Sequence, residues 1–113
     1  MAECGIAFIQ NDSGRTVYVT KSAINADPWQ FVLDGVLGPL VTAAFKIDVG
    51  KNVGITCGNL SVDADLGPNF FIRFEDNNDA PFDKCIIYCS GEPGEHTNYR
   101  VIEQDGKPAL EYL

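Results

Sequence analysis

The stretch from residue 69 to residue 90 constrains the fold more than any other, and it reads NFFIRFEDNNDAPFDKCIIYCS. It contains two strongly apolar runs, residues 70–74 and 85–89, on either side of an acidic loop. Successive side chains of an extended chain point to opposite faces, so Phe70, Ile72 and Phe74 share one face. The apolar runs require a packed core, whereas the polar loop is too costly to bury. This arrangement predicts two core strands that present an exposed acidic loop, which is typical of a recognition protein.

Short strands separated by turn residues are predicted along the whole chain. Residues 4–10 are apolar on both faces and residues 15–20 alternate, and the intervening Asn-Asp-Ser-Gly predicts a tight turn that makes them a β-hairpin. Further strands are predicted at residues 29–33, 45–49, 53–57, 99–103 and 109–113. A helix through residues 31–44 is compatible with propensity alone, but Gly35, Gly38 and Pro39 interrupt it. The pattern therefore predicts an all-β fold, an antiparallel β-sandwich of eight or nine short strands with residues 1–113 in a single domain.

The charge of the chain limits its partners. Sixteen carboxylates oppose eight cations in 113 residues, which gives a net charge of −8. Such a chain repels phosphate backbones, so nucleic acid is not expected as a partner, and anionic lipid is disfavoured for the same reason. Neutral glycans, zwitterionic lipid headgroups, cations and proteins remain open as partners.

The beginning of the chain, Met-Ala-Glu-Cys, lacks the basic start and apolar core of a secretory signal. No apolar run approaches the roughly 20 residues that a membrane-spanning helix needs. The expected location is therefore the cytoplasm, or outside the cell after release without a signal peptide.

The four cysteines are expected to be buried free thiols, since a cytoplasmic protein keeps its cysteines reduced. Cys85 and Cys89 fall on one face of a predicted strand, roughly 13 Å apart, and are too distant to bridge each other. In an oxidising compartment, either one has the alternative of pairing with Cys4 or Cys57.

Enzyme function is not predicted, because the chain lacks the residues that common mechanisms need. His96 is the only histidine and lies in a stretch rich in glycine, proline and glutamate, where a solvent-exposed loop position is expected. No nucleophile elbow, phosphate-binding loop or dinucleotide fingerprint is present. No cofactor is expected, with Ca²⁺ as the one candidate.

The acidic loop is the candidate metal site. Carboxylate and amide oxygens on a loop are the ligands that Ca²⁺ prefers, and Asp76, Asn78, Asp79 and Asp83 offer several of them. The spacing does not fit an EF-hand, and the alternative is that these residues only form turns. Ca²⁺ binding here is a hypothesis.

Aromatic side chains are the candidate ligand contacts. Tyrosine and tryptophan rings have an apolar face and a polar tip, which suits a sugar or a lipid headgroup. Trp29, Tyr88 and Tyr99 are the candidates, with Ser90 and Asn98 beside the two tyrosines. The alternative for Trp29 is a place in the core.

Three stretches resemble the aegerolysin family, small acidic β-sandwich proteins found mainly in fungi and bacteria. Residues 6–19 (IAFIQNDSGRTVYV) resemble its opening pair of strands, and residues 48–59 (DVGKNVGITCGN) resemble its central glycine turn and strand. Residues 88–101 (YCSGEPGEHTNYRV) resemble its late aromatic and cysteine loop. The resemblance implies recognition of membrane lipids, in some members as the targeting half of a two-component pore, with Tyr88, Tyr99 and Trp29 as contacts.

The function expected from these observations is that of a non-enzymatic recognition protein of defence or toxin type. It would bind membrane lipid headgroups through loop aromatics. One alternative is a small carbohydrate-binding lectin, with or without assistance from calcium. The other is a structural or protein-interaction domain, dimeric through the pairing of edge strands or bound to a partner protein.

Overall fold

The computed structural model describes residues 5–22, 30–33, 36–39, 45–56, 69–77, 80–88 and 94–113. These residues form ten strands and no helix, so the predicted all-β fold is confirmed. The strands are β1 (Ile6–Asn11), β2 (Val17–Lys21), β3 (Gln30–Leu33), β4 (Val36–Pro39), β5 (Phe45–Ile47), β6 (Asn52–Thr56), β7 (Phe70–Phe74), β8 (Asp83–Cys85), β9 (His96–Gln104) and β10 (Lys107–Tyr112). Within the described residues, no helix is long and apolar enough to cross a membrane.

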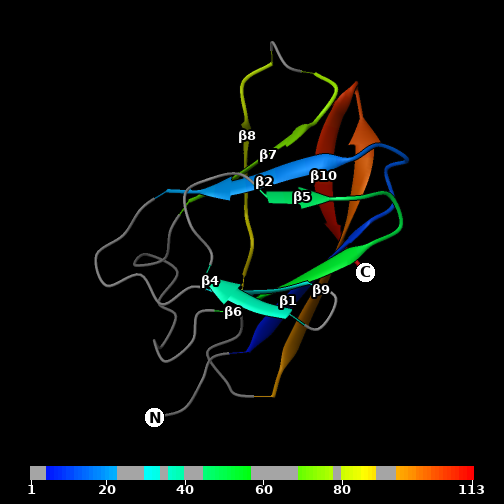
Figure 1. Cartoon of the computed structure of the whole chain (residues 1–113). Coiled ribbons are helices and arrows are strands. Elements are labelled where there is room, and N and C mark those ends of the chain that lie inside the picture. The colour runs from blue at the N-terminus through cyan, green and yellow to red at the C-terminus, as the bar shows by residue number, and fades with distance from the viewer. Residues whose placement is uncertain are drawn as a thin grey trace.

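The strands form two sheets that pack as a sandwich. One sheet has six strands in the order β10-β9-β1-β6-β3-β4, and the other has four in the order β5-β2-β7-β8. Figure 1 shows β2 and β5 in one layer above β1, β6 and β4 in the other. Neighbouring strands are antiparallel with one exception, since β1 runs parallel to β9. A parallel pair needs a long crossover, and here almost the whole chain lies between its two members.

The predicted hairpin of β1 and β2 is wrong. β1 pairs with β6 and β9, whereas β2 pairs with β5 and β7, so the turn at residues 12–16 carries the chain from one sheet to the other. Turn residues predict that the chain changes direction, but they do not specify whether the next strand pairs with the last or crosses the core.

Asn11 explains why the chain crosses at this point. Its side chain is fully buried, and its amide donates to the carbonyls of Arg15 (2.7 Å) and Ile47 (2.9 Å). Its side-chain oxygen accepts from the backbone N–H and the hydroxyl of Ser13, at 3.1 and 2.7 Å. Buried polar groups need hydrogen-bond partners, and the side chain of Asn11 supplies them both to the crossing turn and to β5. It therefore holds the two sheets together at this end of the sandwich.

The core lies between the sheets and takes side chains from both. The six-stranded sheet contributes Ala7, Ile9, Val53, Ile55, Tyr99 and Val101, and the other layer contributes Val17, Val19, Ile47, Phe70, Ile72, Phe74 and Ile87. The predicted inward faces of residues 15–20 and 70–74 are therefore confirmed.

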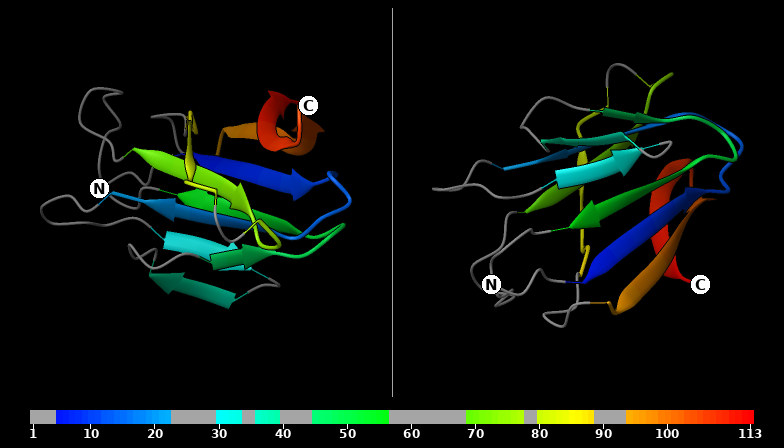
Figure 2. Two further views of the ribbon diagram at one scale, coloured as in Figure 1. Left: turned by 90° about the horizontal axis from the view of Figure 1, so that it is seen from above. Right: turned by 60° about the horizontal axis from the view of Figure 1, so that its bottom comes forward.

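A tight turn joins β9 to β10. Asp105 and Gly106 both have positive φ, 53° and 78°, as a two-residue hairpin turn requires. The predicted Asp-Gly turn is confirmed here. Figure 2 shows that β10, coloured red, is strongly curved.

The strand predicted at residues 85–89 lies earlier in the chain, since β8 spans Asp83–Cys85 and overlaps the prediction only at Cys85. The alternation nevertheless continues beyond the strand: Ile87 is buried, while Ile86 and Tyr88 are exposed. In Figure 1 the yellow segment after β8 descends from the four-stranded layer toward the six-stranded one. Cys85 is a free thiol, as predicted, and the other three cysteines lie outside the described residues.

Candidate functional site

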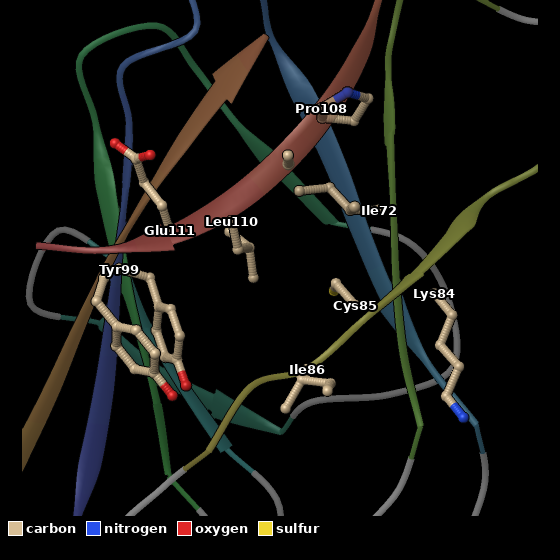
Figure 3. A pocket seen from close by; sticks show the side chains of 10 residues that line it. Ile72, Lys84, Cys85, Ile86, Tyr99, Pro108, Leu110 and Glu111 are labelled. Carbon is tan, nitrogen blue, oxygen red and sulfur yellow. The ribbon is translucent and has the colours of Figure 1, made fainter. Parts of the chain in front are cut away.

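A pocket of about 440 Å³ lies between β8 and β10, the outermost described strands on one side of the two sheets. It is lined by residues 84–86 and 108–112, with Ile72 of β7 and Tyr99 of β9. Figure 3 shows the side chains of Ile72, Cys85, Ile86 and Leu110 around it. Because each sheet ends at this point, the core between the layers opens to the surface.

The strand β10 turns its apolar side chains toward this opening. Leu110 and Tyr112 pair with the inward-facing Val101 and Tyr99, so both lie on the inner face, and Leu110 packs against the core. The backbone N–H of Leu113 donates a hydrogen bond of 3.0 Å to the carbonyl of Asn98. This bond establishes which residues of β10 form hydrogen bonds to β9. In an antiparallel pair, the backbone N–H groups of alternate residues point toward and away from the partner strand. Leu110 and Tyr112 therefore direct their N–H groups away from β9, toward the free edge of the sheet. Position 108 is equivalent, but its proline has no N–H group.

Tyr99 connects the two sides of the pocket, which are the segment that follows β8 and the strand β10. Its side chain is 3% exposed, and its hydroxyl accepts a hydrogen bond of 2.9 Å from the backbone N–H of Tyr88. Its ring stacks on that of Tyr112, with centroids 5.1 Å apart and planes at 26°. Tyr99 therefore holds the segment after β8 close to the end of β10.

Four large apolar side chains are exposed on the two chain segments that border this pocket, namely Ile86 (78%), Tyr88 (46%), Tyr112 (71%) and Leu113 (66%). We call these four residues the apolar rim. Ile86 and Tyr112 line the pocket. The backbone N–H of Leu113 bonds to the carbonyl of Asn98, and the backbone N–H of Tyr88 bonds to the hydroxyl of Tyr99. Single exposed apolar residues are common on soluble proteins, but a gathered group marks an interaction surface.

Charged groups flank the site. Lys84 and Glu111 belong to the pocket lining, and Glu111 forms an ion pair with Arg100. Lys107 of β10 lies 3.6 Å from Asp83 of β8, which joins the two edge strands at one end. Burial raises the pKa of the Cys85 thiol to about 12.

The structure brings together some of the predicted contacts. Tyr88 and Tyr99 are hydrogen-bonded partners, and Asn98 is exposed beside Leu113. Tyr99 differs from the prediction because it is buried and supports the site from within. Trp29 and Ser90 lie outside the described residues.

Sequence reasoning missed Ile86, Tyr112 and Leu113. The signal for Ile86 was present, since it alternates with the inward-facing Cys85 and Ile87 and must point outward. Tyr112 and Leu113 lie within the strand predicted at residues 109–113, but the proximity of this strand to β8 depends on long-range packing. His96 is exposed as predicted, although it begins β9 and its ring packs edge-on against Phe8 at 5.2 Å.

Asp76 and Asp83, two of the four predicted calcium ligands, belong to separate ion pairs. Asp76 accepts hydrogen bonds from Arg15, at 2.5 Å for the shorter, and Asp83 faces Lys107. Asn78 and Asp79 lie outside the described residues. Among the side chains that the structure describes, no three histidine, cysteine or acidic residues are grouped as a metal site requires. Calcium binding at this loop stays a prediction.

Arg15 links the two sheets at the surface. Besides Asp76, it reaches Glu103 of β9 at 3.5 Å, and its guanidinium lies 3.8 Å from the centre of the Phe74 ring. The hydrogen bond from Arg15 holds the pKa of the Asp76 carboxyl below its usual value, and the same contact raises the pKa of Arg15. This cluster has a structural explanation, and none of its residues belongs to the pocket lining.

No protein-family model, no curated protein and no solved structure matches this chain. The site is therefore interpreted from its own geometry, and the resemblance to aegerolysins stays a prediction.

Proposed function

We propose that this protein is a non-enzymatic recognition protein that binds zwitterionic membrane surfaces through its apolar rim. The observation that carries the proposal is the exposure of Ile86 and Tyr112, which line the pocket between β8 and β10, together with that of Tyr88 and Leu113 on the same two chain segments. Fully burying one large apolar side chain is worth about 1.5–3 kcal/mol, so several such residues together supply useful affinity for a lipid surface.

The mixture of side chains in the rim favours lipid over sugar. A sugar stacks on the flat face of an aromatic ring and needs hydrogen-bonding partners around it, whereas exposed isoleucine and leucine suit the apolar part of a bilayer. One face of the Tyr99 ring is occupied by Tyr112, and its hydroxyl is engaged by Tyr88.

The net charge of the molecule limits which lipid headgroups it can bind. A net charge of −8 opposes attraction to an anionic surface, since basic residues are what such surfaces attract. Neutral or zwitterionic headgroups, of the phosphocholine kind, impose no such penalty.

The proposal is tested by cosedimentation with phosphatidylcholine vesicles, with and without added phosphatidylserine. The wild-type protein is expected to bind the zwitterionic vesicles, and Ile86→Ser and Leu113→Ser are each expected to weaken binding by about tenfold, the equivalent of about 1.4 kcal/mol. Val49→Ser is the matched control, because Val49 is an exposed apolar residue (53%) outside the rim and the pocket lining.

The proposal fails if the wild-type protein binds no zwitterionic vesicle, or if Val49→Ser weakens binding as much as the rim variants. Release of a dye trapped in the vesicles is a second readout, because it reports the toxin-type activity that the aegerolysin resemblance implies. Binding to a glycan array without vesicle binding would replace lipid by carbohydrate as the ligand.

A further inference from the structure

We propose that the pocket between β8 and β10 binds the alkyl chain of a single zwitterionic lipid molecule, while the rim contacts the surrounding bilayer. This inference rests on the proposed function for the class of lipid. It adds that recognition includes a chain withdrawn from the bilayer, and not the surface alone.

The interior of the pocket is apolar. Ile72, Cys85 and Leu110 project into it, and Cys85 and Leu110 also pack against the core. Figure 3 shows the amine of Lys84 and the carboxylate of Glu111 pointing away from its centre. Its volume of about 440 Å³ falls within the range of about 300–1,000 Å³ that small-molecule sites occupy.

An alkyl chain suits this interior better than a headgroup does. A phosphate or ammonium inside would lose its water among apolar side chains, at a cost of several kcal/mol. The two charged residues of the lining, Lys84 and Glu111, point away from the centre, and Glu111 is already paired with Arg100, so the described lining offers a headgroup no charged partner inside the pocket.

A polypeptide strand is a poorer occupant. Added strands are held by the backbone donors of an exposed edge, and the outward-facing donors of β10 are interrupted at Pro108. An alkyl chain needs no hydrogen bond at all.

The pocket is continuous with the rim. Ile86 and Tyr112 belong to both, so a chain that leaves the bilayer at the rim meets apolar side chains along its path into the pocket. Tyr99 keeps the two walls together from below by its hydrogen bond to Tyr88 and its stacking on Tyr112.

The test is a calorimetric titration with single-chain phosphocholines that differ by one methylene, each kept below its micelle-forming concentration. Each added methylene is expected to tighten binding about fourfold, since burying one methylene is worth about 0.8 kcal/mol. The gain is expected to stop once the chain fills the pocket, and this plateau distinguishes a finite cavity from adsorption on a surface.

Cys85→Trp is expected to fill the pocket and to weaken binding of the longest chain by at least about tenfold. Val49→Trp adds the same ring at an exposed position outside the pocket and is the matched control. If Cys85→Trp does not fold by circular dichroism, Leu110→Phe takes its place, because it adds volume at the opposite wall.

The results separate the two proposals. Vesicle binding by the wild-type protein without binding of single-chain lipids overturns the pocket inference and leaves the proposed function standing. Affinity that rises along the whole series without a plateau, or that is unchanged in a folded pocket-filling variant, also overturns the inference. Single-chain binding with a plateau but no vesicle binding supports the pocket and overturns the membrane-surface proposal.

Discussion

The hydroxyl of Tyr99, carried by the six-stranded sheet, accepts a 2.9 Å hydrogen bond from the backbone N–H of Tyr88, which follows the last strand of the four-stranded sheet. This bond joins the two layers of the sandwich beneath the pocket. It also places Ile86 and Tyr88 beside Tyr112 and so assembles the apolar rim from two distant parts of the chain.

Tyr99→Phe removes this hydrogen bond and keeps the ring. We expect a loss of about 1 kcal/mol in the free energy of unfolding, measured by urea denaturation, because the partly buried N–H of Tyr88 loses its partner. Vesicle affinity is also expected to fall, because the segment after β8 is held less firmly. Tyr112→Phe, which preserves the stacked ring, is the control and should change stability by less than about 0.5 kcal/mol. Equal stability of the two variants would contradict this role for the Tyr99 hydroxyl.

Asn11→Ala is expected to be among the most destabilising single changes in the chain. It leaves the carbonyls of Arg15 and Ile47 without the amide that now bonds to both, at a fully buried position. An unsatisfied buried polar group costs about 1–3 kcal/mol, so we expect a total loss of about 2–4 kcal/mol in urea denaturation. Asn52→Ala, at an exposed position of β6, is the control. A loss below about 1 kcal/mol for Asn11→Ala would refute the idea that Asn11 joins the sheets.

Asp76→Asn should alter how stability depends on pH. Because Arg15 lowers the pKa of the folded Asp76 carboxyl, the pair stabilises the protein above the ordinary carboxyl pKa. This contribution is lost as the pH falls through the lowered value. The variant is therefore expected to be less stable than wild type at neutral pH and to converge with it in strong acid, as followed by urea midpoints.

The Arg15→Gln background is the control for this effect, since Asp76→Asn should then change little. Added sodium chloride should also reduce the difference at neutral pH, because the pair is exposed to solvent. A difference between wild type and Asp76→Asn that grew toward acid pH would contradict the direction of the pKa shift.

Gly106→Ala should destabilise the β9–β10 hairpin through the backbone alone. Gly106 has a φ of 78°, and an added methyl group at this position would meet nothing within 4 Å. We therefore expect a cost of about 1 kcal/mol that comes from the left-handed conformation and not from a clash. Asp105→Asn is the comparison, because asparagine tolerates its φ of 53° and should leave stability unchanged. Equal effects of the two changes would count against this interpretation of the turn.

Local patterns predicted the strands better than their partners. The alternation of Val17 with Tyr18, and of Ile72 with Arg73, correctly identified which side chains enter the core. Pairing was less predictable, because an Asn-Asp-Ser-Gly turn suits both a hairpin and a crossing between sheets. The burial and bonding of Asn11 decide between them, and these depend on β5, more than thirty residues away.

The site was only partly predictable for the same reason. Tyr88 and Tyr99 attracted attention because tyrosine commonly contacts ligands, but the sequence did not indicate that one would support the other. The pocket exists because β8 and β10 end their sheets on the same side, which is a property of the topology. The outward position of Ile86 could be predicted from alternation, whereas the place of Tyr112 in the pocket lining depends on the register of β10 against β9.

The most direct test of the central claim is vesicle cosedimentation of the wild-type protein beside Ile86→Ser and Val49→Ser, on phosphatidylcholine membranes. The claim is that the apolar rim around the β8–β10 pocket recognises zwitterionic lipid. It predicts that wild type and Val49→Ser sediment with the vesicles equally, while Ile86→Ser binds about tenfold more weakly. Equal binding of all three proteins, or binding by none of them, would contradict it.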